Sequence, residues 1–259
     1  MPLKSPNIAA TLRMPKTGGH SGLFDGLNET SLQMVLGNSV LQTYESGCTI
    51  FQQGDMPTHV YVVIEGTLRT LRNGEDGDEA TIRMLRPGET CMEAVIFMGG
   101  PSPISVQAIE DSKVLLVPAS FIKSHALRDG QFATNLLQIV THHYKNAMHQ
   151  IDAMQIKSPL QRIGYFFLEK FLEAGKPDGL TLPFKKTIIA NYLGMTPETF
   201  SRALNKIRDI GVDIDGEKIH LSDAFVLCQF CDADMAHLCP RHETAECPVC
   251  PLHTNRHKA

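Results

Sequence analysis

Residues 193–211 constrain the fold of this chain more than any other segment. Thr196 suits a helix N-cap, and Pro197 suits the first helical position, where the missing N–H of proline costs nothing. Apolar residues then recur at helical spacing, at Phe200, Leu204 and Ile207. This spacing predicts a helix that packs one face on a core. The opposite face is polar and carries Glu198, Ser201, Arg202 and Asn205.

The polar face of this helix has side chains of the kinds that read DNA bases. A carboxylate accepts a hydrogen bond from cytosine N4, and an arginine binds guanine O6 and N7 together in the major groove. Residues 185–193 predict a shorter helix in front, and Gly194 predicts the turn between the two. The sequence therefore predicts a helix-turn-helix, with Lys185 and Lys186 placed to meet phosphates.

Two further features favour DNA binding, although a polar outer face is common to any amphipathic helix. Residues 214–221 place an Asp-Gly turn between short β-prone runs, which is typical of a hairpin wing. Between residues 183 and 211 there are five Lys or Arg against two Asp or Glu, a balance of +3 in a chain whose net charge is −4. Positive charge is thus concentrated where a DNA backbone would lie.

The region 23–128 predicts a β-rich domain. Between Val40 and Pro118, short apolar runs are separated by Gly, Pro, Asn and Asp at close intervals. This pattern is typical of a β-sandwich or jelly roll. Cys48 and Cys91, isolated in these segments, are expected to be small buried side chains.

A long helix is predicted over residues 129–157. Its apolar stripe steps by three or four residues and is similar to a coiled-coil seam. We expect a homodimer interface here because two-fold pairing suits two DNA half-sites, although a helix inside one domain shows the same pattern. The predicted interface residues are Leu136, Val140, His143, Ala147, Ile151 and Met154. Ser158 and Pro159 then predict the start of another helix, which ends near Gly175.

Length and composition set the outer limits. A chain of 259 residues accommodates two modest domains and an extension. No run of about 18 apolar residues occurs, so no membrane partner is expected, and the N-terminus lacks the layout of a secretory signal, so the expected location is cytoplasmic. The expected α+β organisation is a flexible leader (1–22), a β-roll or jelly roll (23–128), a dimerisation helix (129–157), a winged helix-turn-helix (158–224) and a cysteine-rich tail (225–259).

Five of the seven cysteines lie in that tail. They are Cys228, Cys231, Cys239, Cys247 and Cys250. The outer two pairs give the spacing C-x2-C-x15-C-x2-C, which suits tetrahedral zinc. The fifth cysteine and three Cys-Pro dipeptides are instead typical of iron–sulfur ligation. Thiols without a metal are the third alternative.

The order of these parts resembles that of the Crp/Fnr superfamily of bacterial transcription regulators over residues 23–224. The matching motifs are GCTIFQQGD at 47–55, VYVVIEG at 60–66, RPGE at 86–89 and ETFSR at 198–202. The last is similar to the E-x-x-S-R motif of the Fnr and Dnr branches, which implies that Glu198, Ser201 and Arg202 contact the bases of a TTGAT-type inverted repeat. Pro197 stands where the cyclic-AMP receptor branch carries an arginine, which argues against the operator of that branch.

The resemblance also limits which signals this protein is expected to sense. Family members that bind a cyclic nucleotide hold its phosphate with an Arg-Ser pair after a Gly-Glu. Gly88 and Glu89 are present here, but residues 98–105 contain no arginine, so cyclic AMP is not expected. Residues 93–98 look closer to the nitric-oxide-responsive Dnr branch, where haem is the suspected sensor, yet no His or Cys is spaced as an axial ligand. Fnr proteins sense oxygen with a [4Fe–4S] cluster, usually on N-terminal cysteines and in a minority on C-terminal ones.

Together these features predict a homodimeric transcription regulator that binds double-stranded DNA, with RNA polymerase as a further partner if it activates. We expect it to respond to a redox or gas signal, oxygen or nitric oxide, through an iron–sulfur cluster on the tail cysteines, with zinc as the alternative metal. The alternative function is a regulator that binds a small molecule or haem in the β-roll pocket and has a structural zinc tail. The sequence has neither a nucleotide-cofactor fingerprint nor a catalytic constellation, so an enzyme is not predicted.

Overall fold

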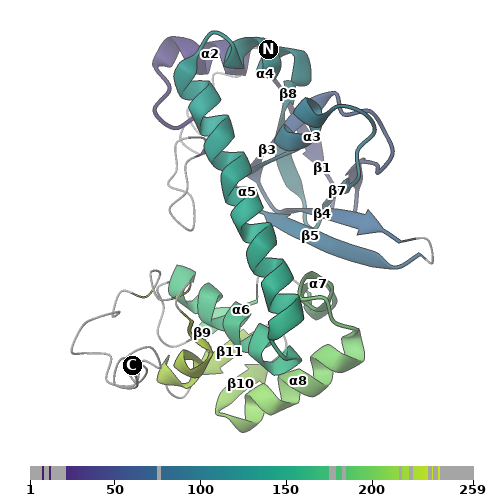
Figure 1. Cartoon of the computed structure of the whole chain (residues 1–259), viewed down its shortest axis with the longest axis vertical. Coiled ribbons are helices and arrows are strands. Elements are labelled where there is room, and N and C mark those ends of the chain that lie inside the picture. Colours follow the sequence, from purple (N-terminus) through teal and green to yellow (C-terminus); the bar gives the residue numbers. More distant parts are fainter. Residues whose placement is uncertain are drawn as a thin grey trace. The chain divides into compact units, whose positions relative to one another are not determined.

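The computed structural model describes residues 22–74, 77–174, 179–182, 185–215, 218–221 and 224–232, together with Ile8, Leu12, Met235 and Cys239. The chain divides into two compact units, one ending at Met148 and the other beginning at His149. Helix α5 (Gly130–Ile156) is continuous through this division (Figure 1).

The first unit contains a β-roll, which confirms the predicted β-rich domain. Its described strands form two four-stranded antiparallel sheets, with the orders β1-β8-β3-β6 and β2-β7-β4-β5. The strands are β1 (Val40–Tyr44), β2 (Thr49–Phe51), β3 (His59–Glu65), β4 (Leu68–Asn73), β5 (Glu79–Leu85), β6 (Thr90–Cys91), β7 (Ser105–Ala108) and β8 (Ser112–Pro118). A short helix, α3 (Glu93–Met98), follows β6.

Strand β3 shows how one sequence fills two cores. Because alternate side chains of a strand point to opposite faces, Tyr61 and Val63 pack between the two sheets, while Val60, Val62 and Ile64 pack against helices. These helices are α2 (Glu29–Gly37), α4 (Ala119–Ala126) and the first turns of α5. The continuous apolar run of β3 therefore reflects burial on both sides.

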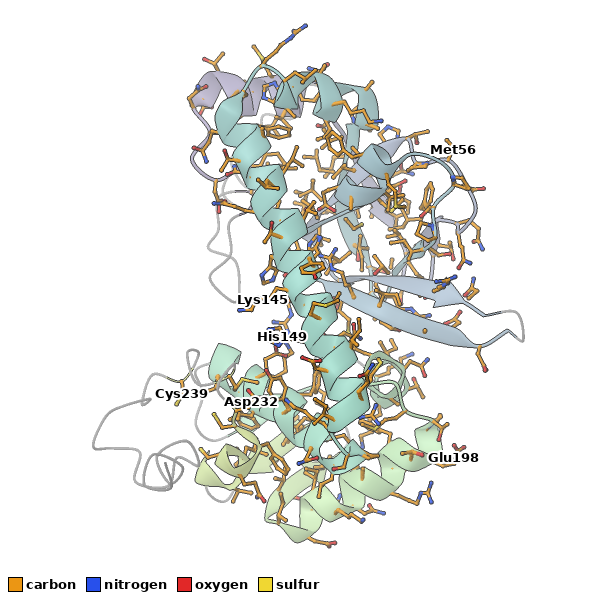
Figure 2. The ribbon with its side chains drawn as sticks, viewed as in Figure 1. Met56, Lys145, His149, Glu198, Asp232 and Cys239 are labelled. Atoms are coloured by element: carbon orange, nitrogen blue, oxygen red, sulfur yellow. The ribbon has the colours of Figure 1, made fainter. Side chains whose placement is uncertain are left out.

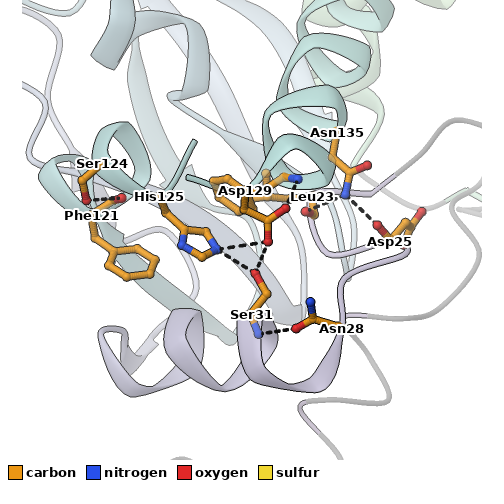
Figure 3. A network of polar contacts seen from close by, with 10 residues as sticks. Leu23, Asp25, Asn28, Ser31, Phe121, Ser124, His125, Asp129 and Asn135 are labelled. Carbon is orange, nitrogen blue, oxygen red and sulfur yellow. Dashed lines mark hydrogen bonds and ion pairs between the residues drawn. The ribbon is translucent and has the colours of Figure 1, made fainter. Parts of the chain in front are cut away.

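A buried polar network joins α2, α4 and the start of α5 (Figure 3). The Ser31 hydroxyl of α2 donates to the Asp129 carboxylate and lies 2.8 Å from Nε2 of His125 on α4. Asp129 also accepts the backbone N–H of Phe132 at 3.0 Å, which caps the start of α5. Since His125 and Asp129 both contact the same buried hydroxyl, this Ser-His-Asp group has the geometry of a structural clamp and not of a nucleophile with its base.

The predicted flexible leader and the predicted burial of Cys48 each need a correction. Ile8 and Leu12 are helical and buried in the core formed with α2, α4 and α5, because their spacing of four places both on one helix face. Cys48 is exposed, since it lies in the turn before β2, whereas Cys91 is buried and its burial raises the pKa of the thiol.

The second unit is a winged helix-turn-helix, as predicted. After α5 come α6 (Pro159–Ala174), β9 (Gly179–Thr181), α7 (Lys186–Tyr192), α8 (Pro197–Asp209), β10 (Val212–Asp215), β11 (Lys218–Leu221) and the 3-10 helix η1 (Ala224–Phe230). Strands β10 and β11 form the predicted hairpin, and β9 adds a third strand beside β11 that the sequence did not predict. The side chain of Gln161 and the Ser158 hydroxyl bond each other's backbone N–H groups, which caps α6 as expected.

Candidate DNA-binding surface and sensor sites

The local structure of α8 follows from its sequence. Thr196 is the N-cap, and its hydroxyl accepts the backbone N–H of Thr199 at 3.2 Å. Phe200, Leu204 and Ile207 are buried, as the apolar spacing predicted. The four polar residues predicted to face DNA are all exposed, namely Glu198, Ser201, Arg202 and Asn205. Glu198, on the first turn of α8, lies at the outer side of the unit (Figure 2).

The charges of this polar face suit a surface that meets DNA. Hydrogen bonds from its own backbone N–H and from the Thr196 hydroxyl lower the pKa of Glu198, with a smaller contribution from Arg202. Glu198 is therefore an acceptor-only carboxylate near neutral pH. The Arg202 side chain makes one long hydrogen bond of 3.4 Å, to the Thr199 hydroxyl. Lys185 is exposed at the N-cap of α7, and Lys186 is the half-buried first residue of that helix.

Two arginines that the sequence analysis did not single out hold this surface in place. Arg208 donates to the Asn205 side-chain oxygen at 2.9 Å and to the Ile214 carbonyl at 3.2 Å, which ties α8 to the wing strand β10. Arg162 of α6 donates to the Leu193 carbonyl at 2.7 Å, at the end of α7. The only sequence signal for either residue was a basic side chain at a helix end or beside a turn.

The last turns of α5 also contact the helix-turn-helix. The Gln150 side chain donates to the Tyr192 carbonyl at 3.1 Å. Gly194 adopts a positive φ of 62°, and a Cβ there would lie 3.1 Å from the Met154 methyl group. Side chains from both α5 and α6 thus contact the turn between α7 and α8. Gly194 allows the positive φ of this turn and leaves room for the close approach of Met154.

The apolar stripe of α5 is rotated slightly from its predicted position. Leu136 is buried in the core of the first unit, and the half-buried His143 ring lies 3.3 Å from the Arg83 guanidinium of β5. Three exposed apolar residues recur every seven positions, at Leu137, Tyr144 and Ile151, which are 68%, 65% and 44% exposed, and Met148, Met154 and Ile156 are exposed as well. The predicted Val140, Ala147 and Met154 each follow one of the residues Leu137, Tyr144 and Ile151 by one helical turn. Spacing alone could not decide between the adjacent leucines 136 and 137.

A second polar group lies inside the β-roll, around Glu93 of α3. Glu93 is 1% exposed, accepts the Thr90 hydroxyl, and has its pKa raised by burial, with Arg83 acting in the opposite direction. The Arg83 guanidinium donates to the Thr90 carbonyl at 3.3 Å. The sequence analysis emphasised Glu89 instead, but Glu89 accepts the backbone N–H of Arg86 in a tight turn.

The described tail residues pack on the second unit. Cys228 and Cys231 are half-buried at one turn, with the Cys231 N–H donating to the Cys228 carbonyl at 3.0 Å, and Cys239 is also half-buried. Cys247 and Cys250 lie outside the described residues. Within the described part of the chain, no group of three or more His, Cys, Asp or Glu is gathered around a common point where an ion could bind.

Comparison with known proteins agrees with both domains. Residues 41–129 match the family model of the cyclic nucleotide-binding domain, and residues 161–230 match that of the Crp-like helix-turn-helix domain. The chain belongs to the Crp/Fnr family of transcription regulators. It is thus a DNA-binding regulator of a non-enzymatic family whose members typically bind DNA as dimers.

Individual Crp/Fnr relatives cover most of the chain. The transcriptional activator protein FnrA of Stutzerimonas stutzeri is 24% identical over 189 residues, which are 71% of this chain and 77% of FnrA. The cyclic AMP receptor protein of Thermus thermophilus is 28% identical over 74% of this chain and 88% of its own. The structure of FixK2 from Bradyrhizobium japonicum has a TM-score of 0.66 and 26% identity, and covers 75% of this chain and 98% of FixK2.

The match to the Crp-like helix-turn-helix domain extends into the cysteine-rich tail. The Crp-like match ends at residue 230 and so includes Cys228, whereas the sequence analysis ended the DNA-binding domain at residue 224. Leu227 is 1% exposed, which agrees with this later boundary. Among the helices of the described residues, none is both long and apolar enough to cross a membrane.

Proposed function

We propose that this Crp/Fnr regulator binds a TTGAT-type inverted repeat as a homodimer. The exposed face of α8 carries the proposal, because Glu198, Ser201 and Arg202 lie together on one face. A carboxylate, a hydroxyl and a guanidinium in this arrangement match cytosine, thymine and guanine edges in a major groove. Lys185 and Lys186 would hold the adjacent phosphates. The seam of α5, redefined as Leu137, Val140, Tyr144, Ala147, Ile151 and Met154, would pair the two copies.

Binding to synthetic duplexes tests the operator. The protein should bind a duplex with two TTGAT half-sites more tightly than one in which the guanine of each half-site is replaced, by about 1–3 kcal/mol for each half-site. Equal affinity for both duplexes at several salt concentrations would exclude this base readout, because phosphate contacts alone do not discriminate between sequences. If the protein activates transcription, RNA polymerase is its further partner.

We further propose that the tail cysteines receive a redox or gas signal through a bound metal centre. Cys228 and Cys231 support this because a backbone hydrogen bond joins them in one turn, and Cys239 supplies a third half-buried thiol. Thiolates at this spacing serve both an iron–sulfur cluster and zinc. With Cys247 and Cys250, either centre has enough ligands, and a cluster would supply chemistry that oxygen or nitric oxide changes.

Anaerobic purification distinguishes these centres. A broad visible absorption that air bleaches identifies an iron–sulfur cluster, and a colourless protein with stoichiometric zinc identifies the alternative. Replacing Cys228 and Cys231 together by serine should abolish metal binding, because the remaining thiolates cannot complete a four-ligand site. Cys239→Ser should keep full zinc content but shift or weaken a cluster absorption. A double variant that retains full metal content would exclude a centre on this pair.

The β-roll supports an alternative signal. The buried Glu93 and Thr90 and the half-buried Arg83 form a polar group, and Arg83 also contacts His143 of α5. Such a group suits a small polar ligand, or it could position a helix that binds one. In that case the tail zinc would be structural. A sharp Soret band in the purified protein would identify haem, which is the other sensor of this alternative.

A further inference from the structure

The segment after the wing is packed into the second unit. We define the strap as residues 227–232 and Met235. Leu227 and Met235 are 1% and 0% exposed, and η1 lies along α6. The Phe230 ring occupies the space beside Gly164, where a Cβ would lie only 2.3 Å from the ring. Figure 2 labels Asp232 of the strap, which pairs with Lys157 just before α6.

The strap ends on the junction between α5 and α6. Lys157 lies between these helices, directly after Ile156 and before Ser158, which caps α6. Its ammonium group is 2.5 Å from Oδ2 of Asp232 and 3.8 Å from the centroid of the Tyr165 ring. Both side chains of the ion pair are partly shielded, at 26% and 34% exposed, so the pair is less screened than one on an open surface.

Asp232 uses both carboxylate oxygens and is the neighbour of Cys231. Its Oδ2 accepts from Lys157 and its Oδ1 accepts the backbone N–H of Met235 at 2.9 Å. Cys231 precedes Asp232 in the chain and forms the turn with Cys228. A shift of the Cys228–Cys231 turn therefore moves the carboxylate that holds Lys157.

We propose that the strap couples thiol chemistry at Cys228 and Cys231 to the α5–α6 junction through the Lys157–Asp232 ion pair. Two thiolates that bind one atom must converge on it, which rearranges the turn and releases or tightens Lys157. Helix α6 carries Arg162, whose bond to the Leu193 carbonyl holds the turn in front of α8. The strap is thereby connected to the DNA-reading helix through bonds within the second unit. As a route for the natural signal, it rests on the function proposed for the tail cysteines.

A dithiol reagent tests this coupling without the natural metal. The full-length chain with Cys239, Cys247 and Cys250 replaced by serine keeps only Cys228 and Cys231 in the tail. Phenylarsine oxide captures such a pair by forming two As–S bonds, and its oxygen leaves as water with the two thiol protons. The arsenic stays trivalent, so no oxidant is needed. Mass spectrometry confirms one adduct on the strap.

The two measurements are the affinity for the specific duplex and the hydrogen exchange of the amides in residues 157–165. Capture should change DNA affinity by about fivefold or more and change exchange at the junction, because allosteric coupling has this size. Asp232→Asn and Lys157→Met should each keep the adduct but lose both responses. Lys170→Met is the matched control, since Lys170 is also a lysine of this unit beside an aromatic ring, but it pairs with Glu169. The control should respond like the parent chain.

Two results would overturn the coupling. One is an adduct that changes neither DNA affinity nor junction exchange in the parent chain, and the other is an undiminished response in Asp232→Asn and Lys157→Met. Because the test variant has serine in place of Cys239, Cys247 and Cys250, either result is independent of whether the wild-type tail binds a metal. Failure of the metal proposal appears instead in the metal content and absorption of the wild-type protein.

Discussion

Arg202 and Lys186 separate base reading from phosphate binding at the scale of single residues. Arg202 is exposed, and its long bond to Thr199 is weak enough to be exchanged for a guanine at little cost. Arg202→Ala should lose about 1–3 kcal/mol on the specific duplex and much less on random DNA. Lys186→Ala should weaken both and reduce the salt slope by about 1. Fluorescence anisotropy titrations at several salt concentrations measure both effects, and equal losses for Arg202→Ala on both duplexes would assign it to phosphate.

Glu93 gives a prediction for pH. Its pKa is raised by burial, so this carboxyl contributes stability that is fully present below its unfolded pKa of about 4.3 and is lost as pH rises through the folded value. Glu93→Gln cannot ionise and lacks this loss. Thermal unfolding between about pH 4.5 and pH 8 should therefore show the wild type losing stability relative to Glu93→Gln as pH rises.

An exposed carboxylate provides the control for this prediction. Glu65 is exposed and pairs with Lys113 at 2.7 Å, so Glu65→Gln should follow the wild-type profile. If the Glu93→Gln and wild-type curves run parallel over the whole range, Glu93 is ionised to the same extent in the folded and unfolded chains and the β-roll holds no pH-dependent carboxyl at this position.

At the scale of elements, α5 shows what a periodic sequence does and does not determine. Its length was predicted to within one residue at each end, since the apolar repeat is long and unbroken. The direction in which the stripe faces was not predicted, because Leu136 and Leu137 are both apolar. Only the packing of Phe132 and Ile139 on the β-roll decides that Leu136 turns inward. The position of the exposed apolar stripe on this helix therefore needed the structure.

Ile151 tests the seam. It is 44% exposed and lies seven residues after Tyr144, within the proposed contact between copies. Ile151→Asp would place two carboxylates together at an apolar two-fold axis, so dimerisation and operator binding should fall together. Analytical ultracentrifugation across a concentration series measures this change. Gln138→Asp, an exposed change one position after Leu137, is the control and should remain dimeric. A dimeric Ile151→Asp at micromolar concentration would exclude this seam.

Other helices and strands also differ in whether their own residues carry a short-range sequence signal that predicts them. Thr196, Pro197 and the Asp-Gly turn of the wing are local signals, and they placed α8 and the hairpin correctly. Strand β9 has no comparable signal because its partner β11 lies about 40 residues further on, and pairing over such distances leaves no short-range pattern. Helix α2 did have one, since Leu32, Val35 and Leu36 recur at helical spacing after the Asn28 N-cap.

At the scale of the whole molecule, the cysteine-rich tail has both a spacing that the sequence shows and packing contacts that only the folded structure shows. The cysteine spacing predicted a metal-binding tail, but it could not predict that Leu227, Phe230 and Asp232 fasten the first part of that tail to α6. Removing residues 226–259 would uncover buried apolar surface and confuse loss of signal with loss of stability. Removing residues 240–259 keeps the strap and three of the five proposed ligands, so it tests the sensor without removing Leu227 and Met235 from the fold.

Binding linkage gives the last prediction, at the scale of the complete protein with its DNA. If a metal centre on the tail changes affinity for the operator by some factor, the operator must change affinity for the metal by the same factor. We expect a factor of about 5 to 150 between the metal-free and metal-bound chains. Competition with a chelator, in the presence of specific duplex or random duplex, measures the metal side of this cycle, and DNA titrations of both forms measure the other. Asp232→Asn should bring both factors close to one while the metal remains bound, because the ion pair with Lys157 is the contact that joins the cysteines to the helix junction. If the change in operator affinity and the change in metal affinity differ, the metal acts outside a single linked equilibrium, for example on the oligomeric state. If the two changes are equal and persist in Asp232→Asn, the metal is coupled to the DNA-reading helix through other contacts of the second unit.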